Sequence, residues 1–438
     1  MTNYIIGVAA WTALFAATLA AQPRFVVGVC THFAQGKGIL EANLSLVRQA
    51  GAGAIRDDMS WSAIERQQGQ YAMPEAWDEF VNRALAAGIQ PLLMLGYGNR
   101  LYDNHDKPRS DEAIEAYTRY AEFVVRHFKG RVRMYEVWNE WDISIGGTTP
   151  GTAEDYAKLL KAVYPRVKKI DPGITVLGGC PTSGGIKKGW LDRMLASDVL
   201  GSLDAVSIHT YNYSGQGRAR TPEAWADFAS AAAASVQRQS GGREVPIYVT
   251  EMGWPTHTGP RGTPPEQSAA YLARMFLLAR TMPYLKGVWW YDFQDDGWKA
   301  DYNENNFGLV RPDLTPKPSY YALAGISTLA ARGEFVAKLQ TQSPDLWALK
   351  FRMPDGKETL ALWNEAPEAM PVVIATRARE RTSVRIVEAG RSPVERPWGL
   401  RDWAGKPPAE LLPDRISVVV GENPVMVTGE NLELIAPQ

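Results

Sequence analysis

Short apolar runs and longer amphipathic segments alternate along most of this chain. The strand-like apolar runs cover residues 25–30, 54–57, 91–95, 133–138, 174–178, 205–209, 246–250 and 287–291. Between them, segments 74–87, 111–128, 153–169, 222–238 and 265–280 have the apolar spacing of amphipathic helices. The pattern predicts repeated strand–helix units.

Helix-start residues fall where this pattern requires them. Pro74 and Pro222 lie at first-turn positions, and Ser110 and Thr152 directly precede predicted helices as N-cap residues. Eight strand–helix units in about 310 residues predict an α/β fold of the (β/α)8 TIM-barrel type. A doubly wound open sheet is the alternative, but no glycine-rich dinucleotide fingerprint follows the first strand.

The pattern changes after Gly333. Runs 346–352 and 358–363 flank a Pro-Asp-Gly turn and predict a hairpin. Further alternating runs cover 371–376, 383–387, 416–420 and 425–427, and the proline-rich, charged stretch 393–413 predicts a long loop. We expect a catalytic barrel over residues 23–333 and a small antiparallel, β-sandwich-like accessory domain over residues 334–438.

The N-terminus carries an apolar stretch over residues 4–21 without a single charge. Its length and small-residue end predict a signal peptide over residues 1–22 and a secreted or periplasmic protein. No Lys or Arg precedes the stretch, so a retained N-terminal anchor is the alternative. No other segment is long enough to span a membrane.

Composition narrows the function without deciding it. The 438 residues are 45% hydrophobic and 22% charged, with a net charge of −1 and no basic block, which argues against nucleic acid as a partner.

Cys30 and Cys180 lie near the ends of predicted strands 1 and 5, farther apart than the ~7 Å that a disulfide allows. We expect two buried free thiols, and neither a metal nor a cofactor; a calcium site in loop 292–319 is the alternative.

Two glutamates occupy equivalent places in the repeating pattern. Glu140 follows the fourth predicted strand and Glu251 follows the seventh. In a barrel the chemistry lies at the carboxyl ends of the strands, where Arg56, His209 and Asp292 also fall. Cleavage of a glycosidic bond requires two carboxyl groups. The sequence therefore predicts Glu140 and Glu251 as an active-site pair.

Alternation along a strand predicts which side chains share a face. Glu136 and Trp138 are expected on the face of Glu140, with Glu136 deeper in the barrel as a structural carboxylate paired with a cation. Val249 is expected on the face of Glu251. The residues alone leave open which glutamate is the acid.

Other residues at the strand ends are candidates for binding or orienting a sugar. Aromatic faces suit sugar rings, and amides, hydroxyls and charged groups can hydrogen-bond hydroxyls or orient the carboxylates; the candidates are Arg56, Asn139, His209, Tyr211, His32, Trp254, Trp141, Trp298 and Asp292. Trp-Asn-Glu occurs again at residues 363–365, where a predicted hairpin offers no partner carboxylate. We expect no catalytic role for this second copy.

The motifs at 138–141, 250–255, 290–292 and 306–309 resemble those of clan A glycoside hydrolases, the retaining (β/α)8 glycosidases. The chain is most similar to family 39 and related bacterial exopolysaccharide hydrolases, and motif 251–255 also resembles the β-1,3-glucanase families. The resemblance implies that Glu140 is the acid/base and Glu251 the nucleophile. It also implies that Trp290 belongs to the substrate site, together with Arg56 and Tyr211.

The function expected from these features is a secreted retaining glycoside hydrolase. It would cleave β-glycosidic bonds of a polysaccharide or oligosaccharide by double displacement, with endo action on an exopolysaccharide as the finer hypothesis. The alternative is a non-catalytic carbohydrate-binding scaffold, but that class would lack one of the two carboxylates. A phosphate-directed barrel is disfavoured, because no glycine-rich loops follow strands 7 and 8.

Overall fold

The computed structural model of the protein describes residues 25–376, 383–386, 409–411 and 415–435. The predicted signal peptide and most of the predicted loop 393–413 lie outside these residues. Within the described ranges, no helix combines the length and apolarity needed to cross a membrane.

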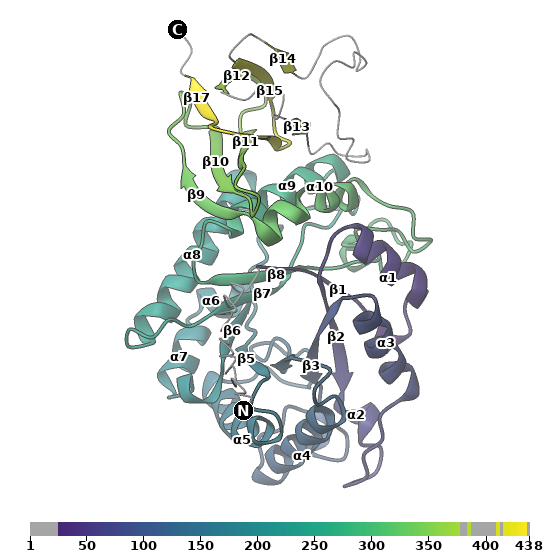
Figure 1. Ribbon diagram of the computed structural model, residues 1–438. Helices are drawn as coiled ribbons and strands as arrows, with labels where there is room; N and C mark the ends of the chain where they lie inside the picture. Colours follow the sequence, from purple (N-terminus) through teal and green to yellow (C-terminus); the bar gives the residue numbers. More distant parts are fainter. Residues whose placement is uncertain (1–24, 377–382, 387–408, 412–414, 436–438) are drawn as a thin grey trace, which may run out of the picture.

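Eight parallel strands close into a barrel (Figure 1). They are β1 (Val26–Cys30), β2 (Ala54–Ser60), β3 (Gln90–Gly96), β4 (Met134–Val137), β5 (Thr175–Gly179), β6 (Ala205–His209), β7 (Ile247–Met252) and β8 (Leu285–Trp290). Each strand pairs with the next one in sequence, and β8 pairs with β1. The predicted (β/α)8 barrel is confirmed and the open-sheet alternative is wrong, because an open sheet would leave β1 and β8 apart.

Helices surround the barrel and connect its strands (Figure 1). They are α1 (Leu40–Gln49), α2 (Trp61–Ile64), α3 (Glu75–Ala86), α4 (Asp111–His127), α5 (Ala153–Ile170), α6 (Ser183–Lys187), α7 (Trp190–Ala196), α8 (Pro222–Gln239), α9 (Pro265–Ala279) and α10 (Pro318–Arg332). The hydroxyl groups of Ser110 and Thr152 accept hydrogen bonds from the first turns of α4 and α5, as N-caps do. The short 3₁₀ turn η5 (Asn303–Asn306) lies in the long loop after β8.

The lower interior of the barrel is filled by small and apolar side chains around one large ring. Trp289 packs there with Cys30, Ala54, Leu92, Leu177 and Ala205. A β-carbon on Gly28 would lie 2.4 Å from the Trp289 ring, so glycine at this position lets the indole fill the interior. The barrel is therefore a packed core below its carboxyl end, and a substrate has room only above it.

Two antiparallel sheets follow the barrel. The first has the order β13 (Ser383–Ile386), β16 (Val425–Gly429), β11 (Glu358–Asn364), β10 (Leu346–Arg352), β9 (Glu334–Lys338); the second has β14 (Ala409–Leu411), β15 (Arg415–Val420), β12 (Met370–Ala375), β17 (Glu433–Ile435). Buried residues of both sheets form one cluster between them, including Leu360 and Ile416. The predicted antiparallel β domain is confirmed, although β14 forms within the stretch expected to be loop.

The second Trp-Asn-Glu sequence lies where this β domain meets the barrel. Trp363 is fully buried, stacks on Trp347, and donates its indole N–H to Glu223 Oε1 at 2.8 Å. Glu223 of α8 also forms an ion pair with Arg274 of α9. The C-terminal sheets accordingly lie against α9 and α10 (Figure 1). In this copy the tryptophan packs a domain interface.

Replacing Glu223 with Gln should destabilise the protein strongly. Arg274 is only 2% exposed, so the variant would remove its one buried carboxylate partner and leave only the half-exposed Glu422, 3.6 Å from Nη1. We expect the free energy of unfolding to fall by about 3 kcal/mol, measured by urea denaturation. Glu244→Gln is the control, because Glu244 pairs with Lys286 in solvent and such pairs contribute about 0–1 kcal/mol. Equal losses in both variants would contradict this account of the interface.

Candidate active site

The backbone leaves strand geometry just before Glu140. Strand β4 ends at Val137, and Trp138 and Glu140 adopt left-handed φ angles of 67° and 47°. Trp138 turns away from the barrel axis and packs on Trp141. The expectation that Trp138 shares a face with Glu136 and Glu140 is wrong, because side chains alternate only while the backbone stays extended.

A similar irregularity positions Glu251. The pairing of β7 with β8 shifts between Val249 and Met252, as at a β-bulge. Thr250 points into the barrel and donates its hydroxyl to Glu136 Oε1 at 2.8 Å, whereas Val249 packs in the outer core. Glu251 nevertheless faces the cavity above the barrel. The prediction that Glu251 shares a face with Val249 is therefore wrong. The prediction that the Glu251 side chain faces the mouth of the barrel is confirmed.

A cavity of about 560 Å³ lies at the carboxyl ends of the barrel strands. Its walls carry charged, polar and aromatic side chains; among them are Arg56, Asp58, Tyr97, Asn139, Glu140, Tyr211, Tyr213, Glu251, Tyr291, Asp296, Glu304 and Phe307. Carboxylate oxygens of Glu140 and Glu251 and a ring nitrogen of His209 all lie within 4.8 Å of one another. The structure therefore brings the two predicted glutamates together.

Arg56 lines the cavity and links three other polar side chains. Its Nε lies 2.6 Å from Glu136 Oε2, Nη1 lies 2.7 Å from Glu251 Oε1, and Nη2 lies 2.8 Å from Asn139 Oδ1. Glu136 is thus the buried structural carboxylate predicted from the sequence, and Arg56 is its cation. Burial raises the pKa of Glu136, whereas the charges of Arg56 and His209 lower it. The lowering effects together are larger, so the pKa lies below its ordinary value.

The two glutamates sit in different electrostatic surroundings. Burial raises the pKa of Glu140; His209, whose Nδ1 lies 3.0 Å from Oε1, opposes this effect and the charge of Glu251 adds to it. Glu251 accepts hydrogen bonds from Arg56 and from the Tyr211 hydroxyl at 3.0 Å. Burial therefore favours the protonated form of Glu140, whereas Glu251 is held by two hydrogen-bond donors, a difference that the residues alone did not reveal.

Three predicted sugar-binding tryptophans do not line the cavity. Trp141, Trp254 and Trp290 are at most 1% exposed. The indole N–H groups of Trp254 and Trp290 donate to the backbone carbonyls of Arg220 and Phe307. The three rings are enclosed behind the cavity wall and do not face the cavity. The interpretation of these tryptophans as sugar contacts is therefore corrected.

The aromatic surface of the cavity comes instead from the predicted Tyr211 and from Tyr97, Tyr213, Tyr291 and Phe307, which were not predicted as site residues. Tyr97 follows β3 directly, and Tyr213 lies two residues beyond the predicted Tyr211. Their positions just after barrel strands are a signal that could have identified them.

The remaining candidates lie on the side of the cavity formed after β1 and β8. His32 lines it with Nδ1 2.9 Å from Asp296; burial lowers its pKa, but Asp296 and Asp292 raise it to about 9. Asp292 is buried behind His32 and lines a second cavity of about 180 Å³. Trp298 is 68% exposed on the loop and is not among the lining residues. The predicted direct sugar contacts of Asp292 and Trp298 are therefore not found, since neither reaches the main cavity.

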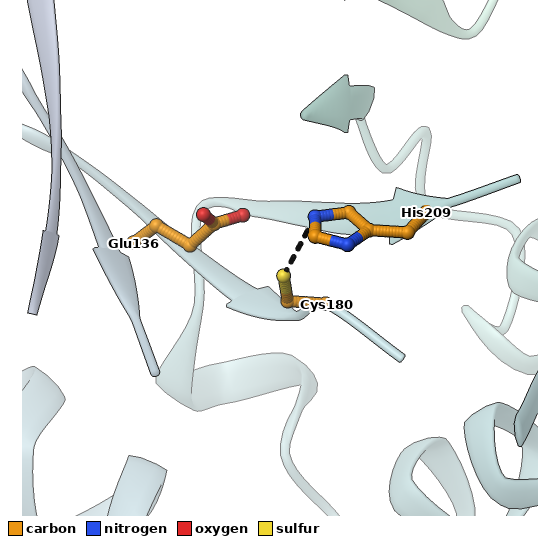
Figure 2. A group of neighbouring side chains, drawn as sticks. All are labelled: Glu136, Cys180 and His209. Atoms are coloured by element: carbon orange, nitrogen blue, oxygen red, sulfur yellow. Dashed lines mark hydrogen bonds between the residues drawn. The ribbon is translucent and has the colours of Figure 1, made fainter. Parts of the chain in front are cut away.

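Three groups of side chains within the described residues come close enough to share a metal ion: Glu136–Cys180–His209, His32–Asp292–Asp296 and Glu140–His209–Glu251. In the first group (Figure 2), both oxygens of Glu136 are already bonded, to Arg56 and Thr250. In the second, Lys37 lies 2.6 Å from Asp296. Cations or donors of the chain itself thus bond Glu136 and Asp296, whereas the two oxygens of buried Asp292 accept no hydrogen bond. Cys30 and Cys180 are both buried and free, as predicted.

Replacing Arg56 with Lys should weaken both the fold and the site. Lysine keeps the charge but cannot bond Glu136, Glu251 and Asn139 together in the planar geometry of a guanidinium. We expect the free energy of unfolding to fall by about 3 kcal/mol and turnover by about 10²-fold, because the carboxylate of Glu251 loses its positioning. Denaturation and steady-state kinetics measure the two effects.

The control for this substitution is Arg131→Lys. Arg131 pairs with Asp78 at a site where both side chains are about one-third exposed. Its replacement should change stability by no more than about 0.5 kcal/mol. An Arg56→Lys variant as stable and active as the control would refute the role given to Arg56.

Two carboxyl groups that converge over the carboxyl end of a (β/α)8 barrel define the class of glycoside hydrolases, which cleave O-glycosyl bonds. The model of the cellulase family, glycosyl hydrolase family 5, matches residues 20–292. The chain belongs to this family and is a glycosidase. No curated protein matches the sequence.

Solved structures place the fold among glycosidases of the expected clan. A family 39 glycoside hydrolase from Bacteroides cellulosilyticus WH2 is 27% identical, with a TM-score of 0.75 over 93% of this chain and 81% of that one. A monomeric β-xylosidase from Caulobacter crescentus CB15 is 17% identical, with a TM-score of 0.66 over 94% and 96%. A family 30 endoxylanase from Clostridium papyrosolvens C71 is 14% identical, with a TM-score of 0.66 over 93% and 97%. The predicted resemblance to clan A, and to family 39 within it, is confirmed.

Proposed function

We propose that the protein is a retaining glycosidase that cleaves β-glycosidic bonds by double displacement. The observation that carries this proposal is the approach of Glu140 and Glu251, whose oxygens lie within 4.8 Å. Carboxyl groups of retaining enzymes lie about 5–5.5 Å apart, whereas those of inverting enzymes lie about 6.5–9.5 Å apart to hold a water between them. The separation here matches the first arrangement.

In the first step, a Glu251 oxygen attacks the anomeric carbon while Glu140 gives its proton to the leaving oxygen. Arg56 and Tyr211 hold the attacking carboxylate through their hydrogen bonds. In the second step, Glu140 takes a proton from water, and the water oxygen attacks the same carbon and releases Glu251. The product keeps the β configuration because two inversions follow one another.

We propose a β-linked polysaccharide or oligosaccharide as the substrate. The Tyr and Phe side chains in the cavity supply apolar faces for sugar rings, and the β-xylosidase and endoxylanase among the similar structures support a β-linked sugar. Endo action on an exopolysaccharide is the finer form of this proposal. A panel of β-glucans, xylans and exopolysaccharides, with product sizes measured over time, tests it: early products of mixed length support endo action, and monosaccharide alone refutes it.

Proton NMR of the first product formed tests the mechanism. A retaining enzyme releases the β-anomer before mutarotation, whereas initial release of the α-anomer would refute double displacement.

We further propose that the protein is exported, which is supported by the uncharged apolar stretch at residues 4–21. Recovery of a shortened protein outside the cytoplasm, with its N-terminus near residue 23, would support export; a full-length cytoplasmic protein would refute it.

A further inference from the structure

A buried thiol lies beneath Glu140 that the proposed mechanism does not use. Cys180 Sγ lies 3.1 Å from His209 Nε2, and Nδ1 of the same ring lies 3.0 Å from Glu140 Oε1. Figure 2 shows the thiol directed at the ring. Cys180 and His209 are both completely buried, so no solvent can replace the hydrogen bond between them. The imidazole is therefore held between Cys180 and Glu140.

We propose that Cys180 is a positioning residue for Glu140: its thiol keeps Nδ1 of His209 directed at Glu140 and bonds Nε2 in both protonation states of the ring. The proposal rests on the acid/base role given to Glu140 above. When His209 is neutral and carries its proton on Nδ1, the thiol donates to Nε2. When the ring is doubly protonated, Nε2–H donates to the sulfur instead, and the thiol hydrogen can turn toward Asn139 Oδ1, 3.7 Å from Sγ.

The reaction requires a partner of this kind. Glu140 gives up its proton in the first step and recovers one in the second, so the charge beside Nδ1 changes twice per turnover. A partner that only donates, or only accepts, would leave buried Nε2 unsatisfied in one of the two states, which is costly. The backbone of Cys180 also holds Glu140 directly, since its carbonyl accepts from the Glu140 N–H at 3.1 Å.

Burial keeps the sulfur in its thiol form. Burial raises the pKa of Cys180 above its ordinary value of 9.0. Burial also lowers the pKa of His209, but Cys180, Glu251 and Glu140 together raise it above 6.5. The other titratable and charged groups that act on Cys180, His209 and Glu140 are Glu136, Arg56, Glu251, Asp142, Glu304, Tyr97, Tyr156, Tyr211 and Tyr213.

Cys180→Ala tests the proposal through two readouts. The first is a pH titration of the ¹⁵N signals of His209 in histidine-labelled protein, which is practical because the chain has five histidines. The thiol bonds Nε2 in both states, but its hydrogen bond to the charged ring is the stronger one, so its loss should lower the His209 midpoint by about one pH unit. The second is the pH profile of kcat/KM with phenyl β-D-xyloside or phenyl β-D-glucoside. A charged His209 lowers the pKa of Glu140. Because His209 loses its charge at lower pH in the variant, the pKa of Glu140 should rise and the basic limb should move to higher pH.

Cys180→Ser should restore both readouts, because a hydroxyl donates and accepts as the thiol does. Cys30→Ala is the matched control: it removes the other buried thiol, which bonds the Thr250 carbonyl, and should leave the His209 signals in place. Should Cys180→Ala fail to fold, Cys180→Gly removes the thiol at a residue whose φ of 53° suits glycine.

Two outcomes refute different claims. An alanine variant that melts earlier but keeps the wild-type His209 titration and basic limb would show that Cys180 only fills space, and would overturn the inference. A wild-type protein that hydrolyses no β-glycoside would instead refute the proposed function, whatever the NMR titration shows.

Discussion

Glu251→Gly is expected to lose turnover of aryl β-glycosides by about 10⁴-fold or more, because it removes the attacking atom itself. Glycine leaves space beside Arg56 and Tyr211, the two donors that hold the carboxylate in the wild-type protein. Sodium azide should enter this space and restore turnover of a dinitrophenyl β-glycoside. The product should be the α-glycosyl azide, since a single displacement inverts the anomeric carbon, and NMR identifies it.

The matched control is Glu365→Gln, in the second Trp-Asn-Glu sequence. Glu365 bonds the Trp347 indole at the edge of the C-terminal sheets and lies outside the cavity, so its loss should leave turnover nearly unchanged. A Glu251→Gly variant that keeps its activity, or that yields only the β-azide, would exclude Glu251 as the nucleophile.

Glu140→Ala is expected to discriminate between substrates by their leaving groups. General acid catalysis contributes about 10²–10⁴-fold, so hydrolysis of a phenyl β-glycoside should fall by that factor. A dinitrophenolate leaves without a proton, and the first step on its glycoside should be nearly unaffected, as a pre-steady-state burst would show. Azide should here attack the glycosyl-enzyme and give the β-azide, opposite to the product of the Glu251 variant.

The same variant removes a limb of the pH profile. The proposed mechanism requires protonated Glu140, so kcat/KM should fall as pH rises through its pKa, which burial places above the ordinary value of 4.5. In Glu140→Ala this basic limb should be absent with the dinitrophenyl substrate. A uniform loss on all leaving groups, with an unchanged pH profile, would contradict the acid/base assignment.

The barrel could be predicted from the sequence because its signals are local and repeated. Apolar runs recur at regular spacing, and residues such as Ser110 and Thr152 mark helix starts through bonds within one turn. The strand β14 was missed because the proline-rich, charged residues around it obscure a run of only three residues. Its pairing with β15 arises from tertiary contact that no local pattern records.

The approach of Glu140 and Glu251 could be predicted, but the way they reach the cavity could not. Strict alternation would set Glu251 beside Val249, yet a bulge in β7 turns it inward. Trp254 was predicted to contact sugar because it follows Glu251 closely in the sequence. Closeness in sequence does not determine whether a ring faces the cavity or packs behind the cavity wall. Only the three-dimensional packing shows that Trp254 is enclosed and that Tyr213 and Phe307 face the cavity.

The placement of the only two cysteines has a practical consequence for anyone handling this protein. Cys30 and Cys180 are at most 2% exposed, so maleimides should not label the native protein. A cysteine introduced on an exposed helix would then accept a fluorophore or surface linker at one defined point, with both natural sulfhydryls left in place. Any slow labelling of the two buried thiols would report transient opening of the barrel, and its rate would measure how often the barrel opens.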